Sequence, residues 1–252
     1  ALELAENITY RLRNDGHLCG YFADECNGEG YALMDGMYNA GCRPAANSLY
    51  ILVEAYRATA DPRYLETAGT LIDWARPEKQ PYINGPTGAK REEDHMRPWM
   101  LNMYLRALAN YLELLKEFDL PDDTGARQIY LAYTDWLRTY AVIELEPLDG
   151  MPRAAYPYQW WFDGRQGDPA DEYAVGNNIP SINNWCYLAA DAMAYAYLLS
   201  GERAYLDLAA ALFRTGAHDP FFPGDNSLYT ETKQMINAIV FGNVFLYVWA
   251  GK

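Results

Sequence analysis

The sequence predicts an all-α fold in which about four helical hairpins form a ring with long loops at one end. Three observations support this fold. Apolar residues recur at three- and four-residue steps, short and long connections alternate, and the second helix of each hairpin repeats a pattern. We treat residues 1–252 as a single domain, either complete or part of a larger protein. The segments with helical periodicity are roughly 1–14, 44–59, 62–75, 97–118, 124–141, 181–199, 202–215 and 229–250.

The connections between these helices are of two kinds. Short turns lie at 58–63, 118–125 and 200–203, and a short turn makes consecutive helices antiparallel. In an up-and-down array, this alternation places every long loop at the same end, where function is then expected. The loops break at glycine and proline before an alternating pattern builds up, so no strand is expected. The long loops cover about 15–43, 76–96, 142–180 and 216–228.

The second helices of the hairpins share a Tyr-Leu start. It occurs in YLETAGTLIDW from Tyr64, YLAYTDWLRTY from Tyr130 and YLDLAAALFRT from Tyr205. Helix 1–14 fits the same pattern, whereas helix 229–250 is of the first kind, so one helix at each end lacks a partner. We therefore predict that helix 229–250 packs against helix 1–14 and closes the ring.

The hairpins resemble those of a known class of carbohydrate enzymes. In LYILVEAYRATADPRYLETAGTLIDWA, residues 49–75, a helix ends in Ala-Tyr, a Thr-x-Asp-Pro turn follows, and Tyr-Leu-x-x-Ala opens the next helix. YLLSGERAYLDLAAALF, residues 197–213, repeats the theme. This style resembles the α/α toroid of six-hairpin glycosidases and related polysaccharide lyases over most of the chain. The resemblance implies a ring of inner helices around a central depression, with an oligo- or polysaccharide bound at the loop-bearing end.

Composition and charge exclude some classes of partner. The formal net charge is −14, and no strong basic patch is visible, so no nucleic-acid partner is expected. No apolar run approaches about 18 residues without polar groups, so no membrane span is expected. We expect this acidic protein to be secreted, either extracellular or periplasmic. The sequence leaves its oligomeric state open.

Aromatic residues gather in the long loop 142–180. Tyr158, Trp160 and Trp161 stand in the run YPYQWWF, and such rings suit the C–H faces and hydroxyls of sugars. The alternative is that the cluster packs as a lid on the helices. No cofactor is expected, except that carboxylates in the same loop could bind Ca²⁺. These carboxylates are Asp163, Asp168 and Asp171.

Catalytic candidates are carboxylates and a histidine in the long loops. A glycoside hydrolase needs two carboxylates across the scissile bond, about 5–5.5 Å apart for retention and about 6.5–9.5 Å for inversion. A lyase needs a base and a group that neutralises a uronate carboxyl. Acids before Pro98 are also explained by the positive end of the following helix. The candidates are Glu93, Asp94 and His95 beside Arg97, with Glu25 and Asp171 in other loops.

Amide side chains recur near the starts of the first-kind helices. If these helices line the ring, their amides surround one depression and hydrogen-bond sugar hydroxyls. The alternative is that they only brace nearby backbone. Asn102 separates the two readings best, because it lies one turn inside its helix. The predicted sugar-binding set is Asn47, Asn102, Asn184 and Asn237, with Arg43 and Arg97 at the rim and His218 in the last long loop.

Two functions remain open at this point. The first is a glycoside hydrolase or polysaccharide lyase that acts on a glycan at the loop-bearing end. The second is a non-catalytic extracellular module that binds glycans or assembles with copies of itself. Acids and histidines in the long loops favour the first, and the lack of a recognisable catalytic motif favours the second.

Overall fold

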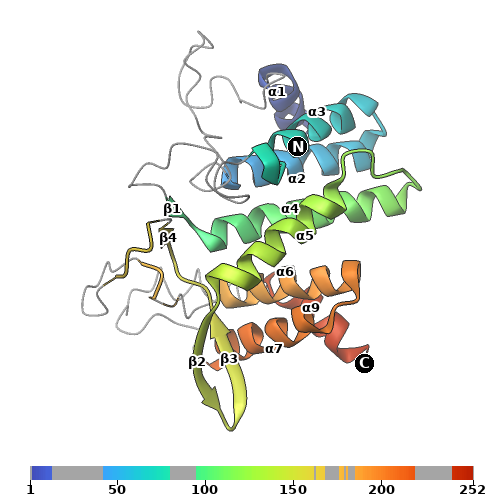
Figure 1. The fold of residues 1–252 in the computed structure, drawn as a ribbon. Coiled ribbons are helices and arrows are strands. Elements are labelled where there is room, and N and C mark those ends of the chain that lie inside the picture. Colours follow the sequence, from blue (N-terminus) through green and yellow to red (C-terminus); the bar gives the residue numbers. More distant parts are fainter. Residues whose placement is uncertain are drawn as a thin grey trace, which may run out of the picture. The chain divides into compact units, whose positions relative to one another are not determined.

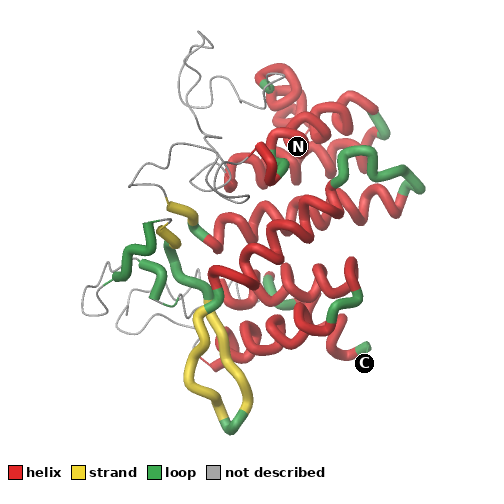
Figure 2. Tube along the Cα trace, in the orientation of Figure 1, coloured by secondary structure: helices red, strands yellow, loops and turns green. Residues whose placement is uncertain are grey.

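The fold was analysed in a computed structural model. It describes residues 2–12, 42–79, 95–161, 163–167, 176–178, 180, 185–218 and 240–251. In this part the chain is mostly helical, as predicted (Figures 1 and 2). The ring of four hairpins stays a prediction. The helices are α1 (Leu2–Arg11), α2 (Cys42–Thr59), α3 (Pro62–Trp74), α4 (Pro98–Glu117), α5 (Ala126–Trp136), α6 (Trp185–Ser200), α7 (Arg203–His218) and α9 (Asn243–Ala250). A short 3-10 turn (Pro77–Lys79) follows α3, and a π turn (Leu137–Ala141) extends α5.

The chain divides into two compact units. The first contains Ala1–Asp94 and Met103–Ala132, and the second contains His95–Asn102 and Tyr133–Lys252. In the first unit, α2 and α3 pack as the predicted hairpin, and α1 packs on both. The α2–α3 turn passes through Ala60 at a φ of 54°. Asp61 then caps α3 by accepting a hydrogen bond from the backbone N–H of Arg63, with Pro62 as the first helical residue.

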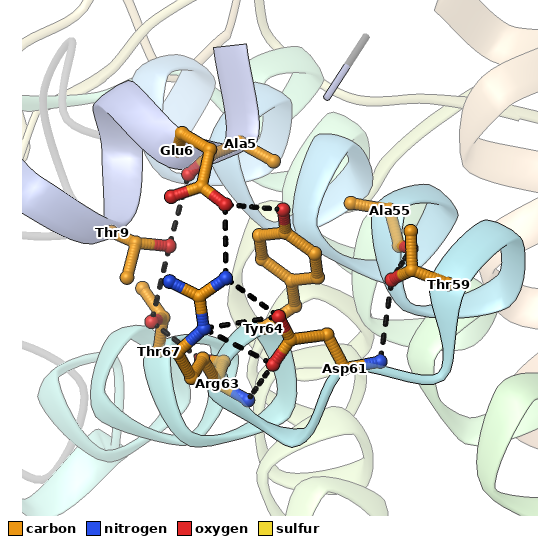
Figure 3. Close-up of polar contacts among 9 residues, drawn as sticks. All are labelled: Ala5, Glu6, Thr9, Ala55, Thr59, Asp61, Arg63, Tyr64 and Thr67. Atoms are coloured by element: carbon orange, nitrogen blue, oxygen red, sulfur yellow. Dashed lines mark hydrogen bonds and ion pairs between the residues drawn. The ribbon is translucent and has the colours of Figure 1, made fainter. Parts of the chain in front are cut away.

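A polar cluster fastens α1 to the start of α3 (Figure 3). The carboxylate of Glu6 accepts hydrogen bonds from Tyr64 Oη at 2.9 Å and from Arg63 Nη2 at 3.0 Å. Arg63 also donates to both carboxylate oxygens of Asp61. At the Tyr-Leu start of α3, Tyr64 thus buries its ring and donates its hydroxyl to the neighbouring helix.

The charges at the start of α3 predict a defined acid sensitivity. Hydrogen bonds from Arg63 lower the pKa of Asp61, so this carboxylate stabilises the fold above its unfolded-state pKa of about 4. That contribution is lost as the pH falls through the lower, folded-state pKa. An Asp61→Asn variant keeps a capping side chain but loses the charge. In urea unfolding curves between about pH 5 and pH 2, we expect wild-type stability to fall more steeply than that of the variant; equal slopes would contradict this.

A second polar cluster joins α4 to α2 within the first unit. Arg57 Nη1 donates to Asn110 Oδ1 at 2.7 Å, and Asn110 Nδ2 donates to Glu54 Oε1 at 2.9 Å. Arg57 also pairs with Glu117 at 2.9 Å. Both the oxygen and the nitrogen of the Asn110 side-chain amide therefore form hydrogen bonds, and these bonds connect α4 to α2.

In the second unit, α6 packs against α7 and α9. Most of α6 is buried, from Cys186 to Ala196, which fits its nearly continuous apolar sequence. Asp191 is the exception in this stretch, since it is a buried carboxylate. It accepts hydrogen bonds from the backbone N–H groups of Gly242 at 2.8 Å and Phe245 at 3.0 Å. Asp191 therefore caps the start of α9 from a neighbouring helix.

The expectation that the loops contain no strand is wrong for the start of loop 142–180. Strands β2 (Ile143–Leu148) and β3 (Met151–Ala155) form an antiparallel hairpin that packs against α7 (Figure 1). Asp149 and Gly150 both have positive φ, 51° and 74°, as a type I′ turn requires. The register shifts between Leu145 and Leu148, where Pro147 interrupts the pattern of bonding.

The prediction of one continuous helix over 229–250 is also wrong in its last part. The chain bends at Phe241 and Gly242 before α9 begins. Gly242 has a φ of 88°, and a Cβ there would lie 2.9 Å from the ring of Phe213. Only glycine suits both conditions. The predicted contact of this helix with helix 1–14 involves α1 in one unit and α9 in the other, and it stays a prediction.

Candidate functional site

The loop that carries the aromatic run is tied to the start of α4. Strand β1 (His95–Met96) pairs antiparallel with β4 (Trp160–Trp161), so that His95 lies opposite Trp161 and Met96 opposite Trp160. Asn177 holds β4 from the other side. Its Oδ1 accepts from Trp161 N at 2.6 Å, and its Nδ2 donates to Trp161 O at 2.9 Å. The backbone thus brings the Trp-Trp pair to the Arg97-Pro98 junction.

Aromatic rings from four separate segments meet at this junction. The ring of Trp99, in the first turn of α4, stacks on that of Trp185, the first residue of α6, with centroids 4.6 Å apart. Tyr158 lies 5.9 Å from Trp99, and Phe241 lies 6.3 Å from Trp185. The first turns of α4 and α6 are therefore joined by stacked side chains. Offset stacking is one of the arrangements that aromatic pairs prefer.

A small cavity, here called the Asn102 pocket, opens beside these rings. Its cavity volume is only about 10 Å³, measured as the space free for the centre of a water-sized molecule. That is about the room that one water needs. The described lining residues all belong to the second unit: Trp99, Asn102, Tyr156, Pro157, Trp185, Cys186 and Ala189.

Three lining residues carry polar atoms that lack a hydrogen-bond partner among the described residues. These atoms are Asn102 Nδ2 and Oδ1, Tyr156 Oη and Trp99 Nε1, and each exposes less than 1 Å². The side chains are at least nine-tenths buried, with relative exposures of 1% for Asn102, 5% for Tyr156 and 8% for Trp99. A buried polar group without a partner costs about 1–3 kcal/mol. The fold therefore bears a cost that a bound polar group could offset.

Burial further favours the neutral form of the pocket phenol. It raises the pKa of Tyr156 strongly, and the neighbouring Cys186 thiol raises it further. Tyr156 therefore remains a neutral hydroxyl throughout the physiological pH range, able to donate and accept one hydrogen bond, and it is a poor base. Cys186, a buried cysteine outside any disulfide among the described residues, lines the same pocket.

The predicted aromatic residues of the loop have two kinds of surroundings. Trp160 meets Trp136 edge-on at 6.1 Å, so it packs against the end of α5. The guanidinium of Arg165 lies 4.1 Å above the ring of Trp161. Tyr158 and both tryptophans are half-buried. Trp160 thus packs against a helix, which is the alternative that the sequence left open for the aromatic cluster.

The predicted rim and amide residues are divided between the two units. Arg97 is half-buried, and its Nε donates to Gln159 Oε1 at 3.4 Å, a long contact. Arg43 and Asn47 are exposed on α2 in the first unit. His218 was expected in a loop, but it is the exposed last residue of α7.

Most catalytic candidates fall outside the described residues. These are Glu25, Glu93, Asp94 and Asp171, together with the predicted sugar-binding residues Asn184 and Asn237. His95 is placed by its backbone in β1. Of the predicted set, the structure thus places Asn102 in a pocket and leaves the carboxylate pair a prediction.

The suggested calcium site is described only at Asp163. Its carboxylate accepts hydrogen bonds from Arg165 N and Nη2, both at 2.9 Å, and the backbone bond from Arg165 lowers its pKa. Asp168 and Asp171 lie outside the described residues. Within the described ranges no three His, Cys, Asp or Glu side chains come close enough together to hold a metal ion.

Sequence reasoning missed the pocket residues Trp99, Trp185 and Cys186, whereas Tyr156 opens the aromatic run YPYQWWF that it singled out. Trp99 and Asn102 are three residues apart and so share a helix face, which the sequence could have shown. The partners from the loop and from α6 are over 50 residues away, and no local pattern pairs them with α4.

Comparisons with family models, curated proteins and solved structures give no match to this chain. Across the residues that the structure describes, no helix combines the length and the apolar character needed to cross a bilayer.

Proposed function

We propose that this chain is a carbohydrate-active protein whose second unit binds a glycan at the Asn102 pocket. The observation that supports the proposal is a set of buried hydrogen-bonding atoms on Asn102, Tyr156 and Trp99 that have no partner in the described part of the chain. Sites for small polar ligands are typically apolar and aromatic with a few polar groups that converge on the ligand. Sugar rings suit such walls, because their C–H faces pack on aromatic rings while their hydroxyls bond to amides and phenols.

Glycan binding without cleavage is favoured at the pocket itself. Its described lining residues include no carboxylate, whereas glycoside hydrolysis requires a pair of them. The phenol of Tyr156 could serve a lyase as a base only with a lowered pKa, and burial raises it. Hydrolase or lyase activity would therefore depend on Glu93, Asp94, His95 or other groups outside this lining.

A screen against neutral and acidic polysaccharides tests the proposal. Binding is followed by tryptophan fluorescence, since Trp99 and Trp185 line the pocket. We expect at least one polysaccharide to change the fluorescence saturably. Newly formed reducing ends would identify a hydrolase, ultraviolet-absorbing unsaturated ends would identify a lyase, and neither product would identify a binding module.

Two tryptophan variants locate the binding in the same screen. Trp99→Phe keeps an aromatic ring but removes the Nε1 donor, and we expect it to weaken binding by about tenfold. Trp249→Phe changes an exposed ring on α9 and should leave affinity unchanged. Failure of every polysaccharide to bind would contradict the proposed function.

A further inference from the structure

We infer that the Asn102 pocket receives one free hydroxyl group of an uncharged sugar and rejects sugars that carry a carboxylate or an acyl group at that position. This inference rests on the proposed function, and it names the class of glycan. Three properties of the pocket support this inference. They are the small size of its cavity, the hydrogen-bonding atoms of its walls and the absence of a charged side chain among its described lining residues.

Size restricts the group that enters. The space of about 10 Å³ within the lining suits a single water-sized group. A hydroxyl has nearly the size and the bonding pattern of water, so it can take the place of one. A carboxylate, sulfate or acetyl group has several heavy atoms and would need the packed walls to move apart, at the cost that overfilling a well-packed interior brings.

The hydrogen-bonding atoms match a hydroxyl. Trp99 Nε1 and Asn102 Nδ2 can only donate, Asn102 Oδ1 can only accept, and Tyr156 Oη can do both. A sugar hydroxyl accepts from donors such as Trp99 and donates to Asn102 Oδ1. A carboxylate can only accept, so it would leave Asn102 Oδ1 buried without a partner.

The described walls of the pocket carry no positive charge. Among the residues that the structure describes, its lining includes no arginine, lysine or histidine. A buried carboxylate without a cation pays a large desolvation cost. Arg165, in the same loop as Tyr156, pairs with Asp163 at 2.9 Å and lies over the ring of Trp161. The chain as a whole, with a net charge of −14, adds a repulsive field for anionic glycans.

Access needs a small rearrangement, because the polar atoms expose less than 1 Å² each. Trp185 is the half-buried member of the wall, whereas Trp99, Asn102 and Tyr156 are buried. Movement of the Trp185 side chain would open a path from solvent to these polar atoms. The sugar ring that carries the bound hydroxyl would then contact the part of Trp185 that faces solvent in the unbound protein. A binding event of this kind alters the Trp99–Trp185 stack, which makes tryptophan fluorescence a direct readout.

The test compares matched oligosaccharides on the full chain. The probes are hexamers of xylose, glucose and mannose, O-acetylated xylohexaose, and hexamers of galacturonate and of alginate. We expect at least one neutral hexamer to bind and both uronate hexamers to bind at least about tenfold more weakly. If xylohexaose binds, its acetylated form should bind more weakly by a similar factor.

Two variants connect the selectivity to the pocket. Tyr156→Phe removes one hydroxyl and Asn102→Asp replaces the amide by a charge; each should weaken binding of the neutral hexamer by about tenfold or more. Thermal unfolding of each variant shows whether it is folded, and Tyr156→Phe is expected to remain so because Tyr156 Oη has no partner in the described chain.

Each outcome has a definite meaning. Equal or tighter binding of a uronate hexamer, weakened by Tyr156→Phe, would overturn this inference and leave the proposed function standing. Binding that neither variant weakens would place the glycan elsewhere and overturn the inference. If no hexamer or polysaccharide binds, the buried atoms serve a structural water only, and both proposals fail.

Discussion

Replacing Asn102 by leucine is expected to raise the free energy of unfolding by about 1–3 kcal/mol and to weaken glycan binding. The stability gain follows because the wild-type amide is buried without a hydrogen-bond partner among the described residues. Leucine has a similar volume and no polar atom in its side chain, so the cost of burying the amide disappears. The loss of binding, by about tenfold or more, follows because both an acceptor and a donor disappear. Urea unfolding and fluorescence titration of the same preparation measure the two effects.

Asn110→Leu is the matched control, because it changes the same residue type in the same helix. Asn110 is hydrogen-bonded to Arg57 and Glu54. We expect its replacement to lower the free energy of unfolding by about 1–2 kcal/mol and to leave glycan affinity unchanged. A loss of stability in Asn102→Leu, with unchanged binding, would make Asn102 a structural brace and contradict its assignment to the site.

Replacing Asp191 by alanine is expected to lower the free energy of unfolding by about 2–4 kcal/mol. The variant leaves the N–H groups of Gly242 and Phe245 without the carboxylate that accepts their hydrogen bonds inside the unit. The first turn of α9 should then fray. Hydrogen exchange at the amides of 242–250 measures the fraying, and chemical denaturation measures the total loss.

Asp191→Asn separates the charge of this cap from its shape. Asparagine keeps one acceptor oxygen, so about half of the loss is expected. Faster exchange confined to α9 in both variants would agree with a capping role. Unchanged exchange in α9, together with a full loss of stability, would show that Asp191 supports α6 instead.

Much of the helical fold could be predicted because its signals are local. The predicted helices 44–59 and 62–75 match α2 and α3 to within two residues at each end. Their apolar periodicity is regular, and Asp61-Pro62 marks the second start in both sequence and structure. The exposed turn at Ala60 requires no distant partner.

The β2–β3 hairpin was missed although its turn is local. Asp149-Gly150 is a strong hairpin signal, and Ile143 to Glu146 alternate. The strands were not predicted because the segment contains Pro147 and Pro152, and proline usually argues against a strand interior. Here a register shift accommodates Pro147, and the carbonyl of Pro152 accepts a hydrogen bond from Arg214.

Other features depend on contacts that a sequence does not reveal. The bend at Gly242 exists because Phe213 leaves no room for a side chain there and Asp191 caps the helix that follows. Asn102 could be singled out from its position one turn inside α4. Its neighbours Tyr156 and Trp185 could not, because only the paired strands β1 and β4 and the packed helices bring them together.

The side-chain amide resonance of Asn102 in an ¹⁵N–¹H spectrum tests the central claim most directly. It is identified by its absence from the spectrum of Asn102→Leu. We predict that a neutral hexamer that binds will shift this resonance saturably, with the same affinity that fluorescence reports. A resonance that stays in place while the chain binds that hexamer would contradict the assignment of the Asn102 pocket as the glycan site.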